Sequence, residues 1–195
     1  MNRKVVSLII LTAILLIFTS VSGYASLPSP RGYINDFAGV IDSNSFSQIS
    51  KITSELKENQ GIEMAVVTID TVAPTTAKDY ATSLFNQWGI GGAEDSGLLI
   101  LLALSEREIQ VEVGYGLEGV LPDGKVGSIL DKAVVPYLAR NDYGRGLLEG
   151  VKSFQGELTG EKYATKSNDG GGFASSLAIF LIIVVAALWL DRKGP

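Results

Sequence analysis

The chain has 195 residues, is 46% hydrophobic, carries a formal net charge of −5 and contains neither cysteine nor histidine. The missing residue types exclude thiolate nucleophiles, imidazole bases, disulfides and His-ligated zinc. An acidic chain disfavours nucleic acid and anionic lipid as partners and favours divalent cations or basic partners, although the same charge also serves solubility alone.

A basic segment and an apolar run open the chain. Arg3 and Lys4 precede Val5–Phe18, which holds no charge, and small residues up to Ala25 form an Ala-x-Ala-like exit. This pattern predicts a secretory signal peptide over residues 1–25, cleaved after Ala25, with an uncleaved anchor as the alternative.

Residues 26–160 form one predicted domain in which helical and strand patterns follow one another. In chain order they predict an irregular segment over 33–41, a helix over 46–60, a buried strand over 62–69, a helix over 76–88, strands over 98–104 and 108–113, and helices over 125–138 and 143–158. This order predicts an α/β fold with a short mixed sheet of at least three strands and helices on both faces.

Local signals mark the ends of these elements. Residues 42–45 offer an N-cap to the first helix, whose predicted apolar face includes Phe46. Thr75 or Thr76 caps the second helix. Pro136 is expected to distort the last turn of the third helix, because proline lacks the N–H that a helix interior requires.

A second apolar run follows the domain. Residues 161–172 are polar and glycine-rich and predict a flexible stalk. Residues 173–190 hold no charge and, at about 1.5 Å per residue, form a helix roughly 27 Å long, which is enough to cross a bilayer. Residues 191–195 then form a short cytoplasmic tail.

Basic residues flank both apolar runs on their outer sides. Arg3 and Lys4 precede the first run, and Arg192 and Lys193 follow the second. The positive-inside rule places both pairs in the cytoplasm, so everything between the runs lies outside. We therefore predict a single-pass protein of the cell membrane with an extracytoplasmic main domain.

The candidate metal ligands are four loop carboxylates, Asp95, Glu118, Asp123 and Asp142. In a hairpin of the two strands over 98–104 and 108–113, Asp95 precedes the first strand, while Glu118 and Asp123 follow the second, which places them at one end. Asp142 stands in the turn before the last helix, which can bring it to the same end. Such a set suits Ca²⁺ or Mg²⁺, although each acid alone also fits a helix cap, a turn or a solvated side chain.

A glycine-rich motif follows the second hairpin strand. Gly114–Gly119 matches G-x-G-x-x-G, which in a βαβ unit binds a dinucleotide. Here Pro122 interrupts the chain before a helix starts, and Glu118 places a negative charge beside the phosphate position. We therefore expect no nucleotide cofactor, and the acidic charge of the chain predicts no nucleic acid partner.

Five ordered motifs resemble the TPM domain family. They are Gly32–Val40, Trp88–Gly91, the Asp-x-Gly-Leu-Leu-Ile-Leu run at 95–101, Val113–Gly119 and Asp142–Gly144. The resemblance implies a three-layer α/β/α sandwich with a short central sheet. It also implies divalent-cation binding through acidic loops, which we assign to the same four carboxylates. Asp36 is a further candidate ligand, whose turn with Asn35 also fits a purely structural role.

The resemblance and the topology suggest two functions. The first is a membrane-tethered, divalent-cation-binding accessory module that assists assembly or maintenance of an envelope complex, with an unidentified membrane protein as its partner. The alternative is a metal-dependent acid phosphatase on small phosphate esters, in which Arg140 or Arg145 clamps the phosphate. A scaffold that binds no metal is the third possibility, so enzymatic activity stays open.

Overall fold

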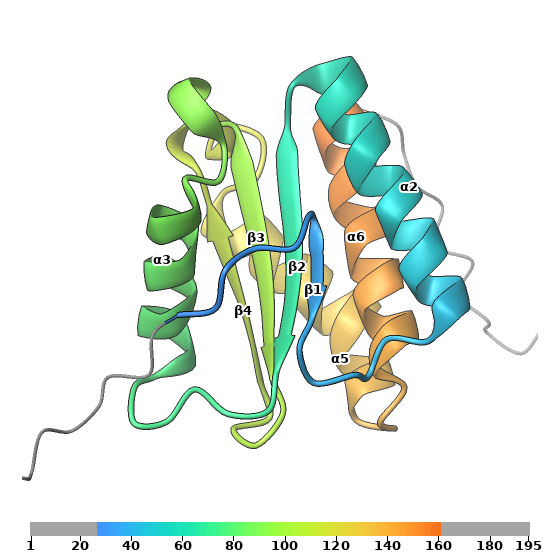
Figure 1. Cartoon of the computed structure of the whole chain (residues 1–195). Coiled ribbons are helices and arrows are strands. Elements are labelled where there is room, and N and C mark those ends of the chain that lie inside the picture. Colours follow the sequence, from blue (N-terminus) through green and yellow to red (C-terminus); the bar gives the residue numbers. More distant parts are fainter. Residues whose placement is uncertain (1–26, 161–195) are drawn as a thin grey trace, which may run out of the picture. The chain divides into compact units, whose positions relative to one another are not determined.

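The computed structural model describes residues 27–160. The signal peptide predicted over 1–25, the stalk over 161–172, the transmembrane helix over 173–190 and the tail over 191–195 lie outside the described residues. Between residues 27 and 160, no helix is both long and apolar enough to cross a membrane. Figure 1 shows the described chain, which divides into two compact units.

Unit 1 comprises residues 27–40 and 53–117 and contains a four-stranded sheet. Its strands, in spatial order, are β1 (Ile34–Asp36), β2 (Glu63–Ile69), β3 (Gly97–Ala103) and β4 (Glu108–Val113). The first three strands run parallel, and β4 pairs antiparallel with β3. The predicted α/β fold with a short mixed sheet is therefore confirmed, as is the hairpin of β3 and β4.

The strand β1 differs from the irregular segment expected over 33–41. Ile34 pairs with Val66 of β2, and Asp36 pairs with Thr68. The pairing with β2 continues one residue past the end of β1, because the Phe37 amide donates to the Thr68 carbonyl oxygen at 3.1 Å. The segment has only three residues, two of which are Asn and Asp. It is therefore too short and too polar to show a strand pattern in the sequence.

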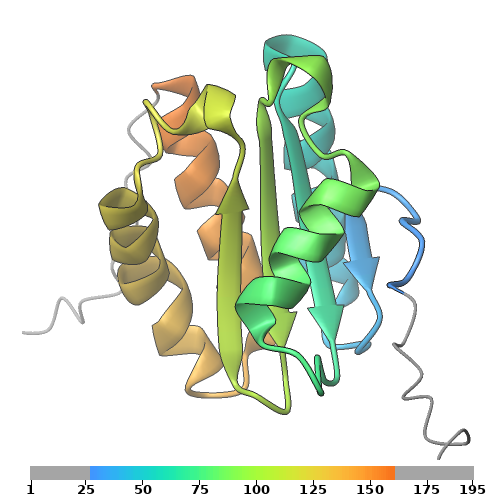
Figure 2. The same ribbon diagram turned by 90° about the vertical axis from the view of Figure 1, so that its left-hand side faces the viewer.

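The centre of the sheet is buried on both faces. All seven residues of β3 are buried, which explains their unbroken apolar run. The helix α3 (Ala77–Trp88) packs on one face, with Ala77, Tyr80, Ala81 and Leu84 buried. Figure 2 shows this helix lying across the strands. As predicted, Thr76 caps α3, because its side-chain hydroxyl oxygen accepts a hydrogen bond from the Asp79 amide. Gly89 ends the helix in a left-handed conformation.

The helix α2 (Ser43–Gln60) is shared between the units, with residues up to Ile52 in unit 2. Its N-cap is confirmed, because a carboxylate oxygen of Asp42 accepts from the amides of Asn44 and Ser45, both at 3.0 Å. One prediction about its apolar face is wrong: Phe46 is 42% exposed. It lies one turn before the buried Ile49, at the start of the helix.

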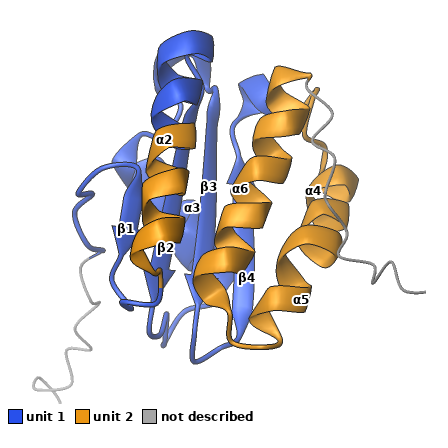
Figure 3. Cartoon of the chain, turned by 90° about the vertical axis from the view of Figure 1, so that its right-hand side faces the viewer, with its two compact units in different colours: residues 1–40, 53–117 blue, residues 41–52, 118–195 orange. Residues whose placement is uncertain are grey.

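Unit 2 comprises residues 41–52 and, after the sheet, 118–160 (Figure 3). Its helical elements are α4 (Asp123–Ile129), the π-helical segment η3 (Leu130–Val134), α5 (Val135–Leu138) and α6 (Tyr143–Thr159). The distortion predicted from Pro136 is present, one turn earlier than expected. Proline has no N–H to donate to the carbonyl oxygen four residues before it. The backbone hydrogen bonds of η3 therefore span five residues, as in a π-helix, instead of four.

Glycines on α6 bring it close to other parts of unit 2. A Cβ added at Gly150 would lie 2.7 Å from Cγ2 of Val134, and one at Gly146 would lie 3.1 Å from Cβ of Tyr137. The helix therefore packs against η3 and α5 through its backbone, and larger residues at these positions cannot keep the same spacing.

Candidate metal site

Asp95 stands in a tight turn just before β3. The turn η1 (Gly92–Glu94) ends at Asp95, whose φ of 48° is left-handed. This conformation costs about 1–2 kcal/mol for most residues and less for Asp or Asn. It is held by two hydrogen bonds of 3.3 Å, from the Asp95 amide to the Gly92 carbonyl oxygen and from the Ser96 amide to that of Gly91.

A second turn, η2 (Tyr115–Leu117), lies directly on this one. The Gly114 amide donates to the Gly97 carbonyl oxygen at 2.8 Å, and the Gly116 amide donates to that of Asp95 at 3.1 Å. A Cβ at Gly116 would lie 2.5 Å from the Glu94 carbonyl oxygen. Only glycine allows the two backbones to approach so closely. Residues 91–97 and 114–117 are called the tip below.

The tip carries exposed acidic side chains. Glu94 and Asp95 are both exposed. Glu63 is attached to the tip through its amide, which donates to the Ser96 carbonyl oxygen at 2.9 Å. Its carboxylate forms an ion pair of 3.3 Å with Lys57.

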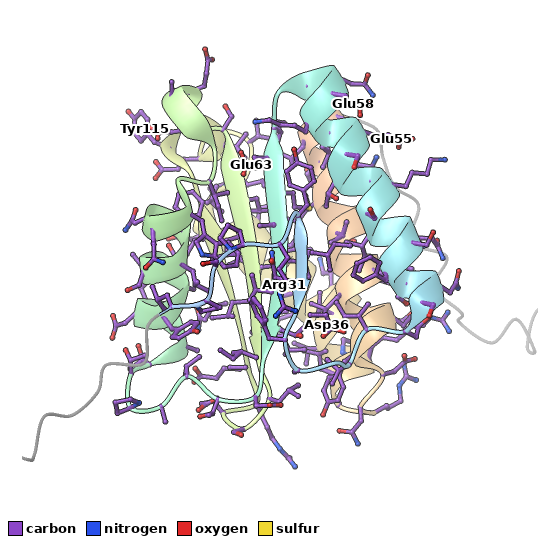
Figure 4. All side chains as sticks on the ribbon, in the orientation of Figure 1. Arg31, Asp36, Glu55, Glu58, Glu63 and Tyr115 are labelled. Carbon is purple, nitrogen blue, oxygen red and sulfur yellow. The ribbon has the colours of Figure 1, made fainter. Side chains whose placement is uncertain are left out.

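Tyr115 is the residue of the tip that the sequence analysis missed. Its side chain is 79% exposed, the largest exposed fraction among the bulky hydrophobic residues of the described chain. Figure 4 shows it at the end of the sheet where β2 begins, the end at which Glu63 also lies. The sequence signal was present in the glycines on either side, which we interpreted as part of a TPM-like motif and as a rejected dinucleotide motif, without considering the tyrosine between them.

The other three predicted ligands belong to unit 2. Glu118 is exposed and directly follows η2, Asp123 is the first residue of α4, and Asp142 is the N-cap residue of α6, where its side chain makes no capping hydrogen bond. The helical stretch from Asp123 to Leu138 has a length of about 24 Å at 1.5 Å per residue, and it separates Asp123 from Asp142.

Asp95 thus lies in one unit and the other three carboxylates in the other. Within residues 27–160, no three Asp or Glu side chains gather into a group that could hold a metal ion. The cation site at Asp95, Glu118, Asp123 and Asp142 stays a prediction. Inside unit 1, the exposed carboxylates of the tip are those of Glu94 and Asp95.

Asp36 has a structural role. One of its carboxylate oxygens accepts from the Thr68 hydroxyl and from the Val40 amide, the latter at 3.1 Å. These bonds tie the end of β1 to β2 and close the turn that follows. This carboxylate oxygen is therefore engaged by the fold.

The two arginines considered for a phosphate stack on one ring. The guanidinium carbons of Arg140 and Arg145 lie 5.1 and 5.2 Å from the ring centre of Tyr137. Both arginines are exposed, so these cation–π contacts contribute on the order of 0.5–1 kcal/mol each.

The fold agrees with the comparison to protein families. The chain belongs to the TPM domain family, whose model matches residues 34–157. The predicted family is therefore confirmed. A comparison with curated proteins finds no match.

Three of the solved structures that match this chain share its fold and come from bacteria. The N-terminal domain of a P. gingivalis protein is 33% identical, with a TM-score of 0.61 over 66% of this chain and 82% of that one. The N-terminal domain of the cg2496 protein from Corynebacterium glutamicum is 16% identical, with a TM-score of 0.54 over 70% of this chain and 88% of that one. The BA42 protein from Bizionia argentinensis is also 16% identical, with a TM-score of 0.54 over 62% and 83%. The last two similarities concern the fold alone.

Proposed function

We propose that this protein is a membrane-tethered, extracytoplasmic TPM module that binds a divalent cation, Ca²⁺ or Mg²⁺, and assists assembly or maintenance of an envelope complex. The observation that carries the proposal is the tip, in which glycine-dependent backbone contacts hold the exposed Asp95 in a left-handed conformation. Left-handed residues other than glycine are uncommon and cluster in part at functional sites.

The charge of the domain supports a cation as ligand. Residues 26–172 hold 20 acidic and 12 basic residues, a net charge of −8. An exposed site with few carboxylates and many water ligands binds Ca²⁺ with a Kd of about 10⁻⁴–10⁻³ M, the range of extracellular modules. Such an affinity suits a site outside the cytoplasm, where the predicted topology places the domain.

Thermal unfolding of the full-length chain in neutral detergent tests the proposal. Trp88 is half-buried against the core of unit 1 and reports unfolding by fluorescence. With a Kd of about 1 mM, Ca²⁺ at about 10 mM stabilises the folded state by about 1.4 kcal/mol. For a domain of this size the Tm then rises by roughly 3–6 °C.

A pair of matched variants separates binding at the tip from general ionic effects. Asp95→Asn keeps the shape and the left-handed tolerance but removes the charge, so the response to Ca²⁺ should fall by more than half. Glu108→Gln removes a charge from an exposed residue at the start of β4, away from the tip, and should respond like the native chain. A Tm of the native chain that stays the same at every Ca²⁺ and Mg²⁺ concentration contradicts the proposal.

The same preparations test the phosphatase alternative. Turnover of an aryl phosphate at acidic pH that depends on Mg²⁺ or Ca²⁺ and is lost in Asp95→Asn favours an enzyme. Turnover that survives the substitution indicates a contaminating activity.

A further inference from the structure

Tyr115 is presented to solvent by the backbone of the tip. Gly114 and Gly116 flank it, and a Cβ at Gly114 would lie 2.1 Å from the Asp95 carbonyl oxygen. Leu117, the last residue of η2, is buried and anchors the turn from below. Gly116 has no side chain and Leu117 is buried, so the Tyr115 ring is the side chain that η2 presents to solvent, 79% exposed (Figure 4).

The backbone around Tyr115 is already ordered. The amides of Gly114, Gly116 and Leu117 each donate to a backbone carbonyl oxygen, at 2.8, 3.1 and 2.9 Å. A tyrosine on a fixed backbone offers a large contact area and loses only the freedom of two side-chain torsions on binding. Aromatic side chains held in this way are typical anchors of protein interfaces.

The neighbours of Tyr115 define the chemistry of the partner. Glu94 and Asp95 are exposed on the turn against which η2 packs, and Glu63 is bonded to Ser96 of the same turn. Lys57 offsets the charge of Glu63 by an ion pair. Glu94 and Asp95 still leave the tip with an excess of negative charge. A cationic side chain over the tyrosine ring gains from the ring face and from these carboxylates together.

We propose that the tip is a docking surface for a lysine- or arginine-bearing segment of a partner protein, with Tyr115 as its central contact. The proposal rests on the proposed function in requiring a partner, and a cation bound at Asp95 would compete with the basic segment for the same carboxylate. The overall charge of −8 across residues 26–172 steers a basic partner towards the domain.

A titration with short peptides tests the surface. The probe is an (Arg-Gly)₅ peptide, added to the isotopically labelled full-length chain in neutral detergent and followed by amide chemical shifts. The expected result is saturable shifts of residues 92–96 and 114–117, with no such shifts from (Glu-Gly)₅. Binding should weaken as ionic strength rises, because the contacts are exposed.

Three variants make the test specific. Tyr115→Ala should weaken binding of (Arg-Gly)₅ at least tenfold, and Tyr115→Phe should bind like the native chain, because the ring face is retained. Glu108→Gln, remote from the tip, should also bind like the native chain. An unchanged Tm in Tyr115→Ala shows that the fold is intact, as expected for a side chain exposed to 79%.

Two results overturn the proposal. One is equal binding of (Arg-Gly)₅ to the native chain and to Tyr115→Ala, which would show that the peptide binds through the general charge of the domain. The other is the absence of shifts at the tip. The response of Tm to Ca²⁺ is measured on the same samples, so a failed cation site with an intact peptide response, or the reverse, identifies which of the two proposals is wrong.

Discussion

The indole N–H of Trp88 donates a hydrogen bond of 2.9 Å to the carbonyl oxygen of Pro28, which lies 60 residues earlier in the chain. Leu27 packs against the same hydrophobic cluster as Trp88. The extended segment before β1 is therefore fastened to the end of α3 and belongs to the fold of unit 1.

Removing this hydrogen bond should loosen the segment. Trp88→Phe keeps an aromatic ring but has no N–H, so we expect a loss of about 1 kcal/mol in the free energy of unfolding, measured by urea denaturation. Amide hydrogen exchange of residues 27–33 should become faster, while that of β2 and β3 should not change at native conditions. Unaltered exchange in 27–33 would show that other contacts of the segment hold it without this hydrogen bond.

Two glycine substitutions in unit 2 should have opposite effects. Gly127 of α4 has open space around an added Cβ, so Gly127→Ala should stabilise the helix by about 0.5–1 kcal/mol. Gly150→Ala would bring its Cβ within 2.7 Å of Val134, a stiff β-branched residue, and should destabilise by about 1–3 kcal/mol. Denaturation midpoints of the two variants decide the matter, and a stabilising Gly150→Ala would contradict the packing described here.

The contact between Asp36 and Thr68 should be worth more than a similar contact on the surface. Thr68 is fully buried, and its hydroxyl donates to the Asp36 carboxylate, so Thr68→Val should cost about 1.5–3 kcal/mol. Thr82 donates to Glu112 at 2.8 Å in a half-buried position, and Thr82→Val should cost less than about 1 kcal/mol. Equal losses in the two variants would show that burial does not set the strength of the Asp36 contact.

The N-cap of α2 should make stability depend on pH. The hydrogen bond with the Ser45 side chain, followed by the one from its amide, lowers the pKa of Asp42 below the ordinary 3.8. The unfolded chain therefore binds the proton more tightly, so this contribution is present above pH 3.8 and is lost as pH falls through the lower folded value.

Asp42→Asn provides the comparison for that contribution. Asparagine keeps the capping oxygen and has no titrating group, so the difference in stability between the native chain and the variant should be largest near neutral pH and shrink towards pH 2. Urea denaturation at several pH values and low ionic strength measures this difference. A difference independent of pH would rule out the charge of Asp42 as its source.

Elements with their own sequence periodicity were predictable, and those that depend on neighbours were not. The run of seven buried residues in β3 and the cap at Thr76 are local signals, and both are confirmed. The strand β1 exists only because β2 supplies its partner, and the exposure of Phe46 depends on where α2 begins relative to its contacts.

The candidate site was predictable only in part. The hairpin of β3 and β4 does bring Asp95 and the 114–117 turn together, as the antiparallel pairing required. The positions of Asp123 and Asp142 depend on the direction of the helical stretch from Asp123 to Leu138, whose extent was predicted but whose direction is set by packing and has no local sequence signal. The outward direction of Tyr115 follows from backbone contacts between two turns, and those contacts have no sequence period.

Unit 2 is assembled from two stretches that are far apart in the chain, residues 41–52 and residues 118 onward, with most of unit 1 between them. During synthesis or export in the N-to-C direction, the last strand of the sheet emerges before α4 and α6 exist. The first half of α2 therefore cannot complete unit 2 until the later helices have been made. Unit 1 has the opportunity to acquire its structure first.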